Sequence, residues 1–284
     1  MKLYQKSEIE KIKEKYGFKF SKNLGQNFLM DKNIIDKIIE GTEINAEDTV
    51  IEIGPGIGVI TQEAANRAKK VIAVEIDKSL IPILEETLAE NDNIKIINED
   101  ILKLDLNKII DEHHAESVKI IGNLPYYITT PIIMKILNDE VKAKSITVMM
   151  QKEVAERIKA EPGTKTYGAI SVAVQYSCLV KKIADVPRTV FVPQPNVDST
   201  VLKLIPRGKG GVEVQDKKLF FECIKAGFGQ RRKTLSNSLQ TIRGTSKETI
   251  IASLNAAGIE PTRRAETLTL EEFGKLSNEV YKRL

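Results

Sequence analysis

The stretch that decides the fold is Val50-Ile51-Glu52-Ile53-Gly54-Pro55-Gly56-Ile57-Gly58. Its apolar start predicts a short buried strand, and its alternating glycines predict a tight turn into a helix. Such glycines let a ligand approach the backbone beside the positive end of that helix. A dinucleotide-binding loop needs glycine at the first, third and sixth positions, but the sixth position here is Val59. The spacing therefore argues against a dinucleotide-binding loop.

Short apolar runs alternate with segments of helix length on both sides of this loop. Strands alternating with helices predict a doubly wound, mostly parallel sheet with helices on both faces. A late apolar run, 201–204, predicts one more strand that we expect to be antiparallel. The other predicted strands are 50–53, 71–74, 94–97, 118–121 and 146–149, with a helix over 79–90 between two of them.

Capping residues mark the helix ends in the amino-terminal part. Ser7 and Glu10 form a capping-box pattern that predicts the start of a first helix. Asp31 predicts the start of a second helix, and Gly41 predicts its end.

The clearest break in composition is the segment 206–211, which predicts a linker between two domains, 1–206 and 207–284. The residues after it predict a smaller all-helical domain, whose last helix opens with a capping box of Thr269 and Glu272. That domain carries 15 Lys and Arg against 9 Asp and Glu, a net charge of +6, whereas the first 206 residues have a net charge of −2. The asymmetry favours a basic surface for a polyanion such as RNA.

Composition narrows the class of protein. The 284 residues are 42% hydrophobic and 29% charged, which is typical of a globular chain. The first residues have no apolar core and predict no secretory signal, and no apolar run is long enough for a membrane span. Cys178 and Cys223 lie far apart, and His113-His114 has no ligand partner at metal spacing, so we expect no metal. These features favour a cytoplasmic protein.

Two carboxylates follow the next two predicted strands. Glu75 ends the second strand and is placed to accept hydrogen bonds from ribose hydroxyls. Asp100 follows the third strand, where its carboxylate could accept from an adenine amine while Ile101 contacts the ring. A lone acid would be an ordinary turn residue. Asp100 is instead the third acid in register with the glycine loop, after Glu52 and Glu75, which favours a nucleoside site.

The fourth strand ends in Gly122-Asn123-Leu124-Pro125-Tyr126-Tyr127. The Asn123 side-chain oxygen and the Leu124 backbone carbonyl can both accept hydrogen bonds from an exocyclic amine and stabilise positive charge that develops on it. The Tyr126 ring can stack on a base, which contributes about 1–3 kcal/mol. An aniline-like amine barely binds a proton, so no strong general base is needed to deprotonate it before it reacts. The pattern predicts a site that orients an exocyclic amine as a nucleophile.

Taken together, these motifs resemble the bacterial small-subunit ribosomal RNA adenine dimethyltransferases, whose loss gives kasugamycin resistance, along nearly the whole chain. The glycine loop resembles the nucleoside-methionine loop of class I (Rossmann-like) methyltransferases. The other segments that carry the resemblance are Leu24-Gly25-Gln26-Asn27-Phe28-Leu29, Asn123-Leu124-Pro125-Tyr126, Phe191-Val192-Pro193-Gln194-Pro195-Asn196-Val197-Asp198-Ser199 and Gly227-Phe228-Gly229-Gln230-Arg231-Arg232-Lys233-Thr234-Leu235.

The resemblance implies a site and a reaction. It implies S-adenosylmethionine as methyl donor and two adjacent adenines near the 3′ end of 16S ribosomal RNA, in the small subunit during its assembly, as substrate. We expect a monomer. Asn123, Leu124 and Tyr126 would hold the target adenine, and Phe191 would cover its opposite face. The residues implied to contact the cofactor are Gln26, Asn27, Leu29, Gly54, Gly56, Glu75, Asp100, Ile101 and Asn123.

Two segments leave alternatives open on their residues alone. Phe191 lies in a loop with two prolines, where an exposed ring could stack on a flipped base, or the loop could be anchored in the core. Arg231, Arg232 and Lys233 suit phosphate contacts, but they equally fit a solvated helix face.

Other functions compete with this interpretation. An enzyme that methylates 23S ribosomal RNA and confers macrolide resistance would use the same active-site chemistry. A DNA adenine methyltransferase shares the asparagine-proline-tyrosine pattern but would not explain the terminal motifs. A non-catalytic RNA-binding assembly factor is a third alternative, which the intact Glu75, Asp100 and Asn123 disfavour.

Overall fold

A computed structural model of the chain describes residues 2–21, 24–230 and 232–284. It divides into two compact units. The first comprises Met1–Ala155 and Lys181–Pro206, and the second comprises Glu156–Val180 and Arg207–Leu284. The second unit is thus discontinuous in sequence. The predicted boundary places Glu156–Val180 in the first domain instead, because the linker at 206–211 marks only one of the three points at which the chain passes between the units.

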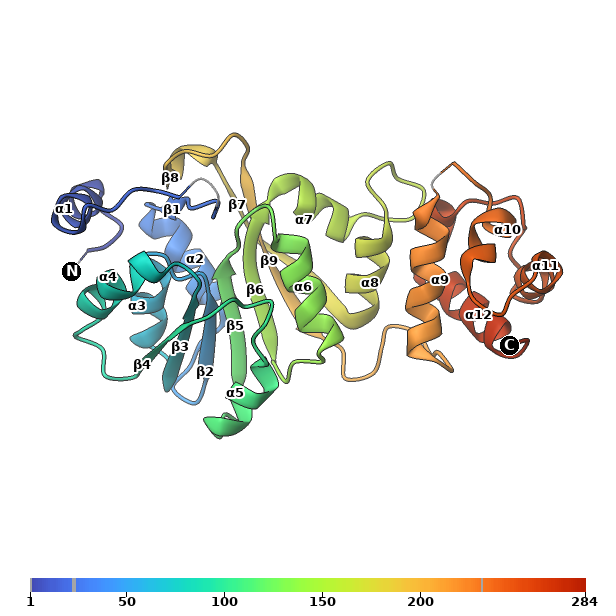
Figure 1. Ribbon diagram of the computed structural model, residues 1–284, viewed down its shortest axis with the longest axis horizontal. Coiled ribbons are helices and arrows are strands. Elements are labelled where there is room, and N and C mark those ends of the chain that lie inside the picture. The colour runs from blue at the N-terminus through green and yellow to red at the C-terminus, as the bar shows by residue number, and fades with distance from the viewer. Residues whose placement is uncertain (1, 22–23, 231) are drawn as a thin grey trace. The chain divides into compact units, whose positions relative to one another are not determined.

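A mixed sheet forms the centre of the first unit, and within the described residues it has seven strands in the order β4-β3-β2-β5-β6-β9-β7 (Figure 1). The first five in this order pair in parallel, and β9 runs antiparallel to β6. This confirms the predicted doubly wound, mostly parallel sheet and its late antiparallel strand. The strands are β2 (Thr49–Ile53), β3 (Lys70–Glu75), β4 (Ile94–Asn98), β5 (Val118–Asn123), β6 (Ser145–Gln151), β7 (Cys178–Val186) and β9 (Ser199–Pro206).

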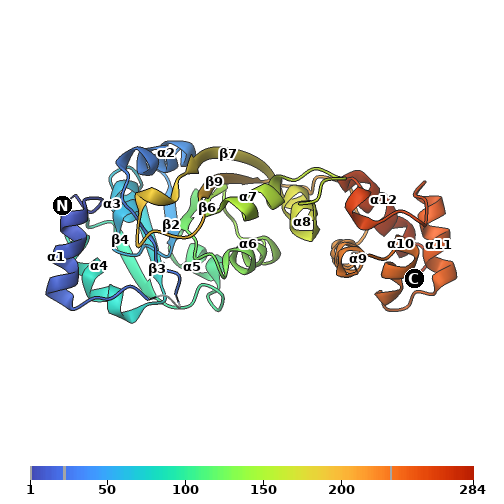
Figure 2. The same cartoon turned by 90° about the horizontal axis from the view of Figure 1, so that it is seen from above.

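Helices cover both faces of this sheet, as Figure 2 shows. On one face lie α2 (Lys32–Thr42) and α3 (Val59–Ala65), and on the other lie α5 (Leu106–Glu112) and α6 (Thr129–Asn138). The short helix α4 (Ile81–Thr87) connects β3 to β4, and α7 (Lys152–Lys159) follows β6. Because parallel strands end at the same edge, the loops after β2, β3, β4 and β5 meet there, and the helices fill the space on either side.

Two predicted helix ends differ from the structure. The first helix, α1 (Lys6–Tyr16), begins after Gln5, which makes no side-chain cap, so the predicted Ser7–Glu10 capping box is wrong. Asp31 caps α2 as predicted, by accepting from the Asn33 and Ile34 amides. Gly41 lies inside α2, which continues to Thr42, so the predicted end of this helix is wrong. A Cβ on Gly41 would lie 2.7 Å from Ile183 Cγ2. This glycine serves close packing, and Glu43 supplies the left-handed cap with φ 60°.

The second unit is largely helical. Its core joins Phe220, Phe273 and Leu254, all fully buried. Thr269 and Glu272 form the predicted capping box: the Thr269 amide donates to Glu272 Oε2 at 2.8 Å, and the Glu272 amide donates to Thr269 Oγ1 at 3.2 Å. Its helices are α8 (Ala169–Ser177), α9 (Lys217–Gly229), α10 (Leu235–Ser238), α11 (Lys247–Ala256) and α12 (Leu270–Tyr281). In the described part of the chain, no helix is both long and apolar enough to cross a membrane.

Candidate active site

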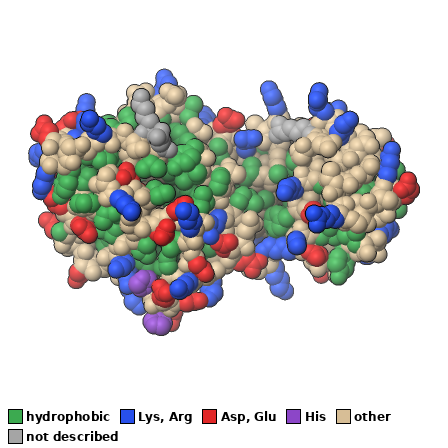
Figure 3. All heavy atoms as spheres, in the orientation of Figure 1, with side chains coloured by type: hydrophobic (Ala, Val, Ile, Leu, Met, Phe, Trp, Pro, Cys, Tyr) green, Lys and Arg blue, Asp and Glu red, His purple; other side chains and the backbone are tan. Residues whose placement is uncertain are grey.

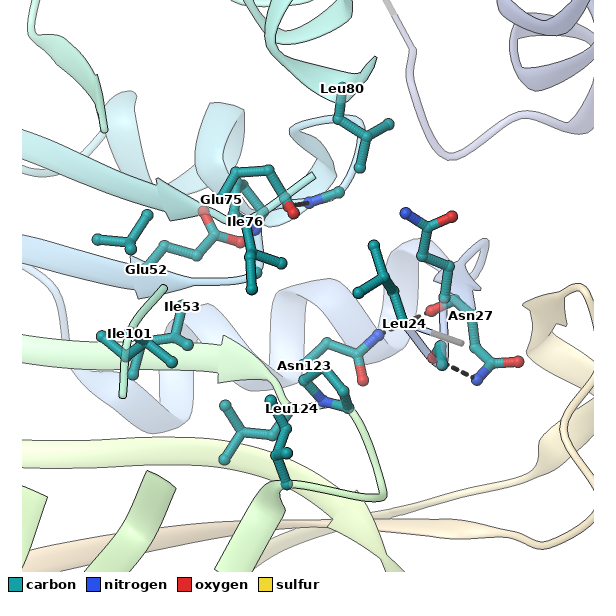
Figure 4. Close-up of a pocket in the computed structure, with 18 of the residues that line it drawn as sticks. Leu24, Asn27, Glu52, Ile53, Glu75, Ile76, Leu80, Ile101, Asn123 and Leu124 are labelled. Atoms are coloured by element: carbon teal, nitrogen blue, oxygen red, sulfur yellow. Dashed lines mark hydrogen bonds between the residues drawn. The ribbon is translucent and has the colours of Figure 1, made fainter. Parts of the chain in front are cut away.

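A pocket opens at the carboxyl edge of the parallel strands. The loops after β2, β3, β4 and β5 line it together with residues 24–29, which we call the amino-terminal strap (Figure 4). The structure thus brings together all the residues that the sequence assigned to the cofactor, namely Gln26, Asn27, Leu29, Gly54, Gly56, Glu75, Asp100, Ile101 and Asn123, with Leu124 and Tyr126 from the predicted base site.

The glycine loop needs its glycines for two separate reasons. Gly54 and Gly56 have φ of 70° and 62°, a backbone region that other residues rarely adopt. A Cβ on Gly56 would also lie 2.9 Å from Cε1 of Phe28, which belongs to the strap. At Gly54 the nearest atom to such a Cβ is the Asn123 carbonyl oxygen at 3.9 Å, so space remains above this part of the loop. The loop therefore presents bare backbone to the pocket.

Glu75 closes one side of this loop at the tip of β3. Its Oε1 accepts from the Asp77 amide at 2.9 Å, and its Oε2 accepts from the Gly56 amide at 3.3 Å. Burial raises the pKa of Glu75 to about 7 even though these amides favour the charged form. The carboxyl is held rigidly in the pocket and can accept hydrogen bonds from a bound diol.

Glu52 lies beneath the glycine loop near the end of β2 and is 1% exposed. Its Oε2 and the Thr61 hydroxyl have no hydrogen-bond partner among the described residues. Burial, with a smaller contribution from the charge of Glu75, raises the pKa of Glu52 to about 8. This side chain is therefore largely protonated at neutral pH, which limits the negative charge under the pocket.

The amino-terminal strap is tied to the sheet by its side chains. Gln26 Oε1 accepts from the Ser21 amide at 2.7 Å, while Gln26 Nε2 donates to Asp77 Oδ2 at 2.6 Å. Phe28 and Leu29 form the short strand β1 (Phe28–Leu29), which pairs with β8 (Phe191–Val192). These contacts place a segment from far upstream in the sequence over the glycine loop.

Asn123, the last residue of β5, reaches the strap directly. Its Nδ2 donates to the Asn27 carbonyl oxygen at 2.8 Å. Figure 4 shows this side chain pointing toward Leu24 and Asn27. Because the amide nitrogen is engaged there, the Asn123 Oδ1 atom is left as an acceptor for a donor in the pocket.

Tyr126 is held by its hydroxyl. The Tyr126 Oη atom lies 2.7 Å from Ser199 Oγ at the start of β9. Burial raises the pKa of Tyr126, so the phenol stays neutral. The ring is fixed at its hydroxyl end and is suited to a flat contact with a base rather than to proton transfer.

Leu124 lines the pocket, whereas Phe191 does not belong to its described lining. Leu124 lines the pocket, but its side chain is buried and its amide donates to the Met149 carbonyl, so only its own carbonyl can serve as an acceptor for a base. Phe191 is 3% exposed, pairs with Leu29 across β1 and β8, and is absent from the described lining of the pocket. The loop is anchored in the core, so stacking of Phe191 on a base stays a prediction that needs this ring to move.

Asp100 and its neighbours form the side of the pocket next to β4. Asp100 Oδ1 accepts from the Leu102 amide at 2.9 Å, which fixes the carboxylate in its turn. Ile101 is buried below it, whereas Ile76, from the loop after β3, is 46% exposed. Both isoleucines line the pocket. This corner therefore combines a carboxylate with apolar side chains, which suits a purine ring.

The predicted RNA contacts lie in the second unit. Arg232 and Lys233 follow α9 and are exposed, while Arg231 lies outside the described residues. On the face drawn in Figure 3, Lys and Arg side chains outnumber acidic ones over this unit. The described residues hold no group of three or more His, Cys, Asp or Glu side chains that could bind a metal.

The chain matches known proteins along most of its length. Residues 17–282 match the family model described as ribosomal RNA adenine dimethylase. The chain belongs to this family. Its parallel sheet, glycine loop and Asn123-Leu124-Pro125-Tyr126 turn are accordingly those of a class I methyltransferase.

Two named relatives of this dimethylase are similar to it over nearly their whole length. The chain is 51% identical to ribosomal RNA small subunit methyltransferase A of Clostridioides difficile (strain 630), and the match covers 98% of this chain and 96% of the relative. It is 52% identical to the protein of the same name from Alkaliphilus oremlandii (strain OhILAs), covering 98% and 97%.

Solved structures extend the comparison to three dimensions. A dimethyladenosine transferase from Plasmodium falciparum is 26% identical and has a TM-score of 0.76, over 88% of this chain and 95% of that one. The 23S rRNA methyltransferase ErmE is also 26% identical, with a TM-score of 0.68 over 89% and 99%. The fold is thus shared with a dimethyladenosine transferase and with a 23S rRNA methyltransferase, while the higher sequence identity lies with the small-subunit relatives.

Sequence reasoning missed three residues of this dimethylase site. Asp77 holds the strap through Gln26, Ser199 holds Tyr126, and Ile76 lines the pocket. Asp77 carried a local signal, because it precedes Ser79 at the spacing of an Asx turn. The roles of Ser199 and Ile76 depend on contacts between distant segments, which no local pattern reveals.

Proposed function

We propose that this chain transfers methyl groups to the N6 amine of adenines in small-subunit ribosomal RNA. The observation that carries the proposal is the arrangement of Asn123. Its Nδ2 is bound to the Asn27 carbonyl, so its Oδ1 is available to an amine at the mouth of a pocket that also holds Glu75. Membership of the dimethylase family supports the same chemistry.

The pocket fits S-adenosylmethionine, which supplies an electrophilic methyl group when bound. The bare backbone at Gly54 leaves room for the ligand, and Glu75 offers carboxylate oxygens to ribose hydroxyls. Ile76, Ile101 and Asp100 provide apolar contact and an acceptor for the adenine part. The strap covers this site through Gln26 and Asn27, which would exclude water from it.

The chain's own groups would prepare the target base. Asn123 Oδ1 and the Leu124 carbonyl would accept from the two hydrogens of the exocyclic amine and orient its lone pair. The same two oxygens favour the positive charge that develops on nitrogen as it is alkylated. Tyr126, fixed by Ser199, would stack on the ring. The proton lost afterwards comes from an acidic ammonium, so water suffices as its acceptor.

We further propose that the substrate is a pair of adjacent adenines near the 3′ end of 16S RNA, methylated twice each while the subunit is assembled in the cytoplasm. The small-subunit relatives at 51% and 52% identity support this target over 23S RNA. We also propose that the chain acts as a monomer, since the described residues that line the pocket form one wall-to-wall site within a single chain.

The test is mass spectrometry of RNA nucleosides. The protein is incubated with S-adenosylmethionine and undermethylated small ribosomal subunits, with large subunits in parallel. N6,N6-dimethyladenosine confined to small-subunit RNA is the expected outcome. The same product in large-subunit RNA would move the chain to the macrolide-resistance type. Cofactor binding without product in either RNA would contradict the proposed substrate.

A further inference from the structure

Tyr127 stands apart from the other aromatic residues of the pocket. It lines the pocket next to Tyr126, yet 55% of the residue is exposed. No hydrogen bond of its hydroxyl is found within the described residues. Large apolar groups left exposed at the rim of a binding pocket commonly contact the ligand.

The backbone under Tyr127 is fixed. The Ile128 amide donates to the Pro125 carbonyl at 3.1 Å, which closes a turn with Tyr126 and Tyr127 at its two central positions. The Thr129 hydroxyl donates to the same carbonyl at 2.9 Å. On one side, a Cβ added to Gly25 of the strap would lie 3.5 Å from Tyr127 Cδ1. The Tyr127 ring therefore projects from a turn whose backbone is fixed by hydrogen bonds. One side of the ring lies near the strap, and the rest is open to solvent.

A base that leaves its stack exposes the faces of its neighbours. An enzyme that acts on an exocyclic amine must take the base out of the stack, and the flanking base then loses a stacking partner. An aromatic ring beside the pocket can replace that partner, and every base offers a flat face for it. Tyr126 is directed into the site by Ser199, so the next ring along the turn is the one placed for the flanking nucleotide.

We propose that Tyr127 stacks on the nucleotide adjacent to the target adenine and thereby holds the RNA strand in register with the pocket. This inference rests on the proposed function. Tyr127 acts as a positioning residue for the RNA, distinct from the groups that contact the reacting amine. A ring is required for this role, while its hydroxyl is dispensable.

The test compares three variants, Tyr127→Ala, Tyr127→Phe and Tyr127→Leu, in methylation of undermethylated small subunits. Tyr127→Ala should raise KM for the RNA by about fivefold to about 100-fold, as expected for removal of one stacked base, with a smaller change in kcat. Tyr127→Phe should behave as the wild type, and Tyr127→Leu should resemble the alanine variant. Affinity for S-adenosylmethionine, measured by calorimetry, should stay within about twofold of the wild type in all three.

Tyr281→Ala is the matched control, since Tyr281 in α12 is a tyrosine of similar exposure, 49%, in the other unit. An unchanged RNA KM in Tyr127→Ala, or a leucine variant as good as the wild type, would overturn the stacking role. Equal losses of cofactor affinity and of RNA affinity in Tyr127→Ala would also overturn the stacking role, because they would mean that Tyr127 holds the strap in place instead. If the wild type itself forms no product in small subunits, the proposed function fails and the inference falls with it.

Discussion

The side-chain amide of Asn123 donates to the backbone carbonyl of Asn27 at 2.8 Å, across 96 positions of sequence. One hydrogen bond thus joins the end of a central strand to the strap that covers the cofactor pocket. It also decides which end of the asparagine amide faces the substrate. Under the proposed function, cofactor binding and base orientation would therefore share one contact.

Replacing Asn123 by alanine should remove most turnover. The variant loses an acceptor for the target amine, and loss of one such preorganised group typically lowers kcat by about 100-fold or more. Thermal unfolding should change little by comparison. The control is Asn107→Ala, whose amide bonds the Asp139 carbonyl and the Lys142 amide away from the pocket. Near-normal kcat for Asn123→Ala would refute the assigned role.

Replacing Gly56 by alanine should weaken cofactor binding. The change strains a backbone at φ 62° and drives a Cβ to 2.9 Å from Phe28, so the loop or the strap must shift. We expect affinity for S-adenosylmethionine to fall by at least about tenfold, which corresponds to roughly 1.4 kcal/mol. Calorimetric titration measures this.

The matched control for Gly56 is Gly163→Ala. Gly163 also has a positive φ, 83°, but nothing lies within 4 Å of a Cβ built there. This variant carries the backbone cost alone, so it should lose stability and retain cofactor affinity. Equal affinity losses in both variants would mean that the approach of Phe28 is irrelevant to binding.

Replacing Gln26 by alanine should raise KM for S-adenosylmethionine and leave KM for the RNA nearly unchanged. The variant loses both hydrogen bonds that tie the strap, one of them to the charged Asp77, and such a bond contributes about 1.5–3 kcal/mol. Steady-state kinetics with each substrate varied in turn separates the two constants. Gln240→Ala, which removes a local bond to the Ser236 carbonyl, serves as control. A rise confined to the RNA KM would contradict this role of the strap.

Replacing Glu52 by glutamine should flatten the pH dependence of stability. The pKa of Glu52 is about 8 in the native state against an ordinary value of 4.5, so between these pH values the native state holds a proton that the unfolded state lacks. Glu52 alone should then lower the free energy of unfolding of the wild type by up to about 1.4 kcal/mol per pH unit as pH rises through this window. The glutamine variant should lack this contribution and keep the similar one from Glu75, which ends at about pH 7.

Urea unfolding between about pH 5 and about pH 8 checks the Glu52 prediction. Glu90→Gln, at an exposed carboxyl, should keep the wild-type slope. If Glu52→Gln keeps the same slope as well, the buried carboxyl is not protonated in the native state and the explanation fails.

Replacing Arg232 and Lys233 together by alanine should weaken binding to the RNA and reduce its salt dependence. Removing one cation that neutralises a phosphate lowers the slope of log K against log salt by about 0.7–0.9. A filter-binding series in increasing salt measures the slope. Lys181→Ala with Lys182→Ala, an adjacent exposed pair on β7, provides the control. An unchanged slope would return Arg232 and Lys233 to an ordinary solvated surface.

Much of the fold follows from the sequence because buried parallel strands are short apolar runs. Val50–Ile53 and the runs after it are recognisable without any partner. Strand β7 was not predicted, since Lys181, Lys182 and Asp185 interrupt its apolar pattern. Gly41 was misjudged for a related reason: its requirement is the close approach of Ile183, a residue remote in sequence.

The site was predictable to the extent that function resides in local motifs. The loops that end the strands were found, and they line one pocket because parallel strands end together. Contacts between motifs were not predictable, among them Gln26 with Asp77 and Tyr126 with Ser199. The burial of Phe191 also depends on pairing with Leu29, which no local pattern specifies.

The strap has a thermodynamic consequence. Since its residues form one wall of the pocket, only molecules with the strap in place can bind the cofactor fully, and the measured dissociation constant is the intrinsic one divided by the fraction so arranged. Ligand binding must in turn favour the closed arrangement by the same free energy. The strap and the cofactor would thus stabilise one another, so a change that displaces residues 24–29 should weaken cofactor binding.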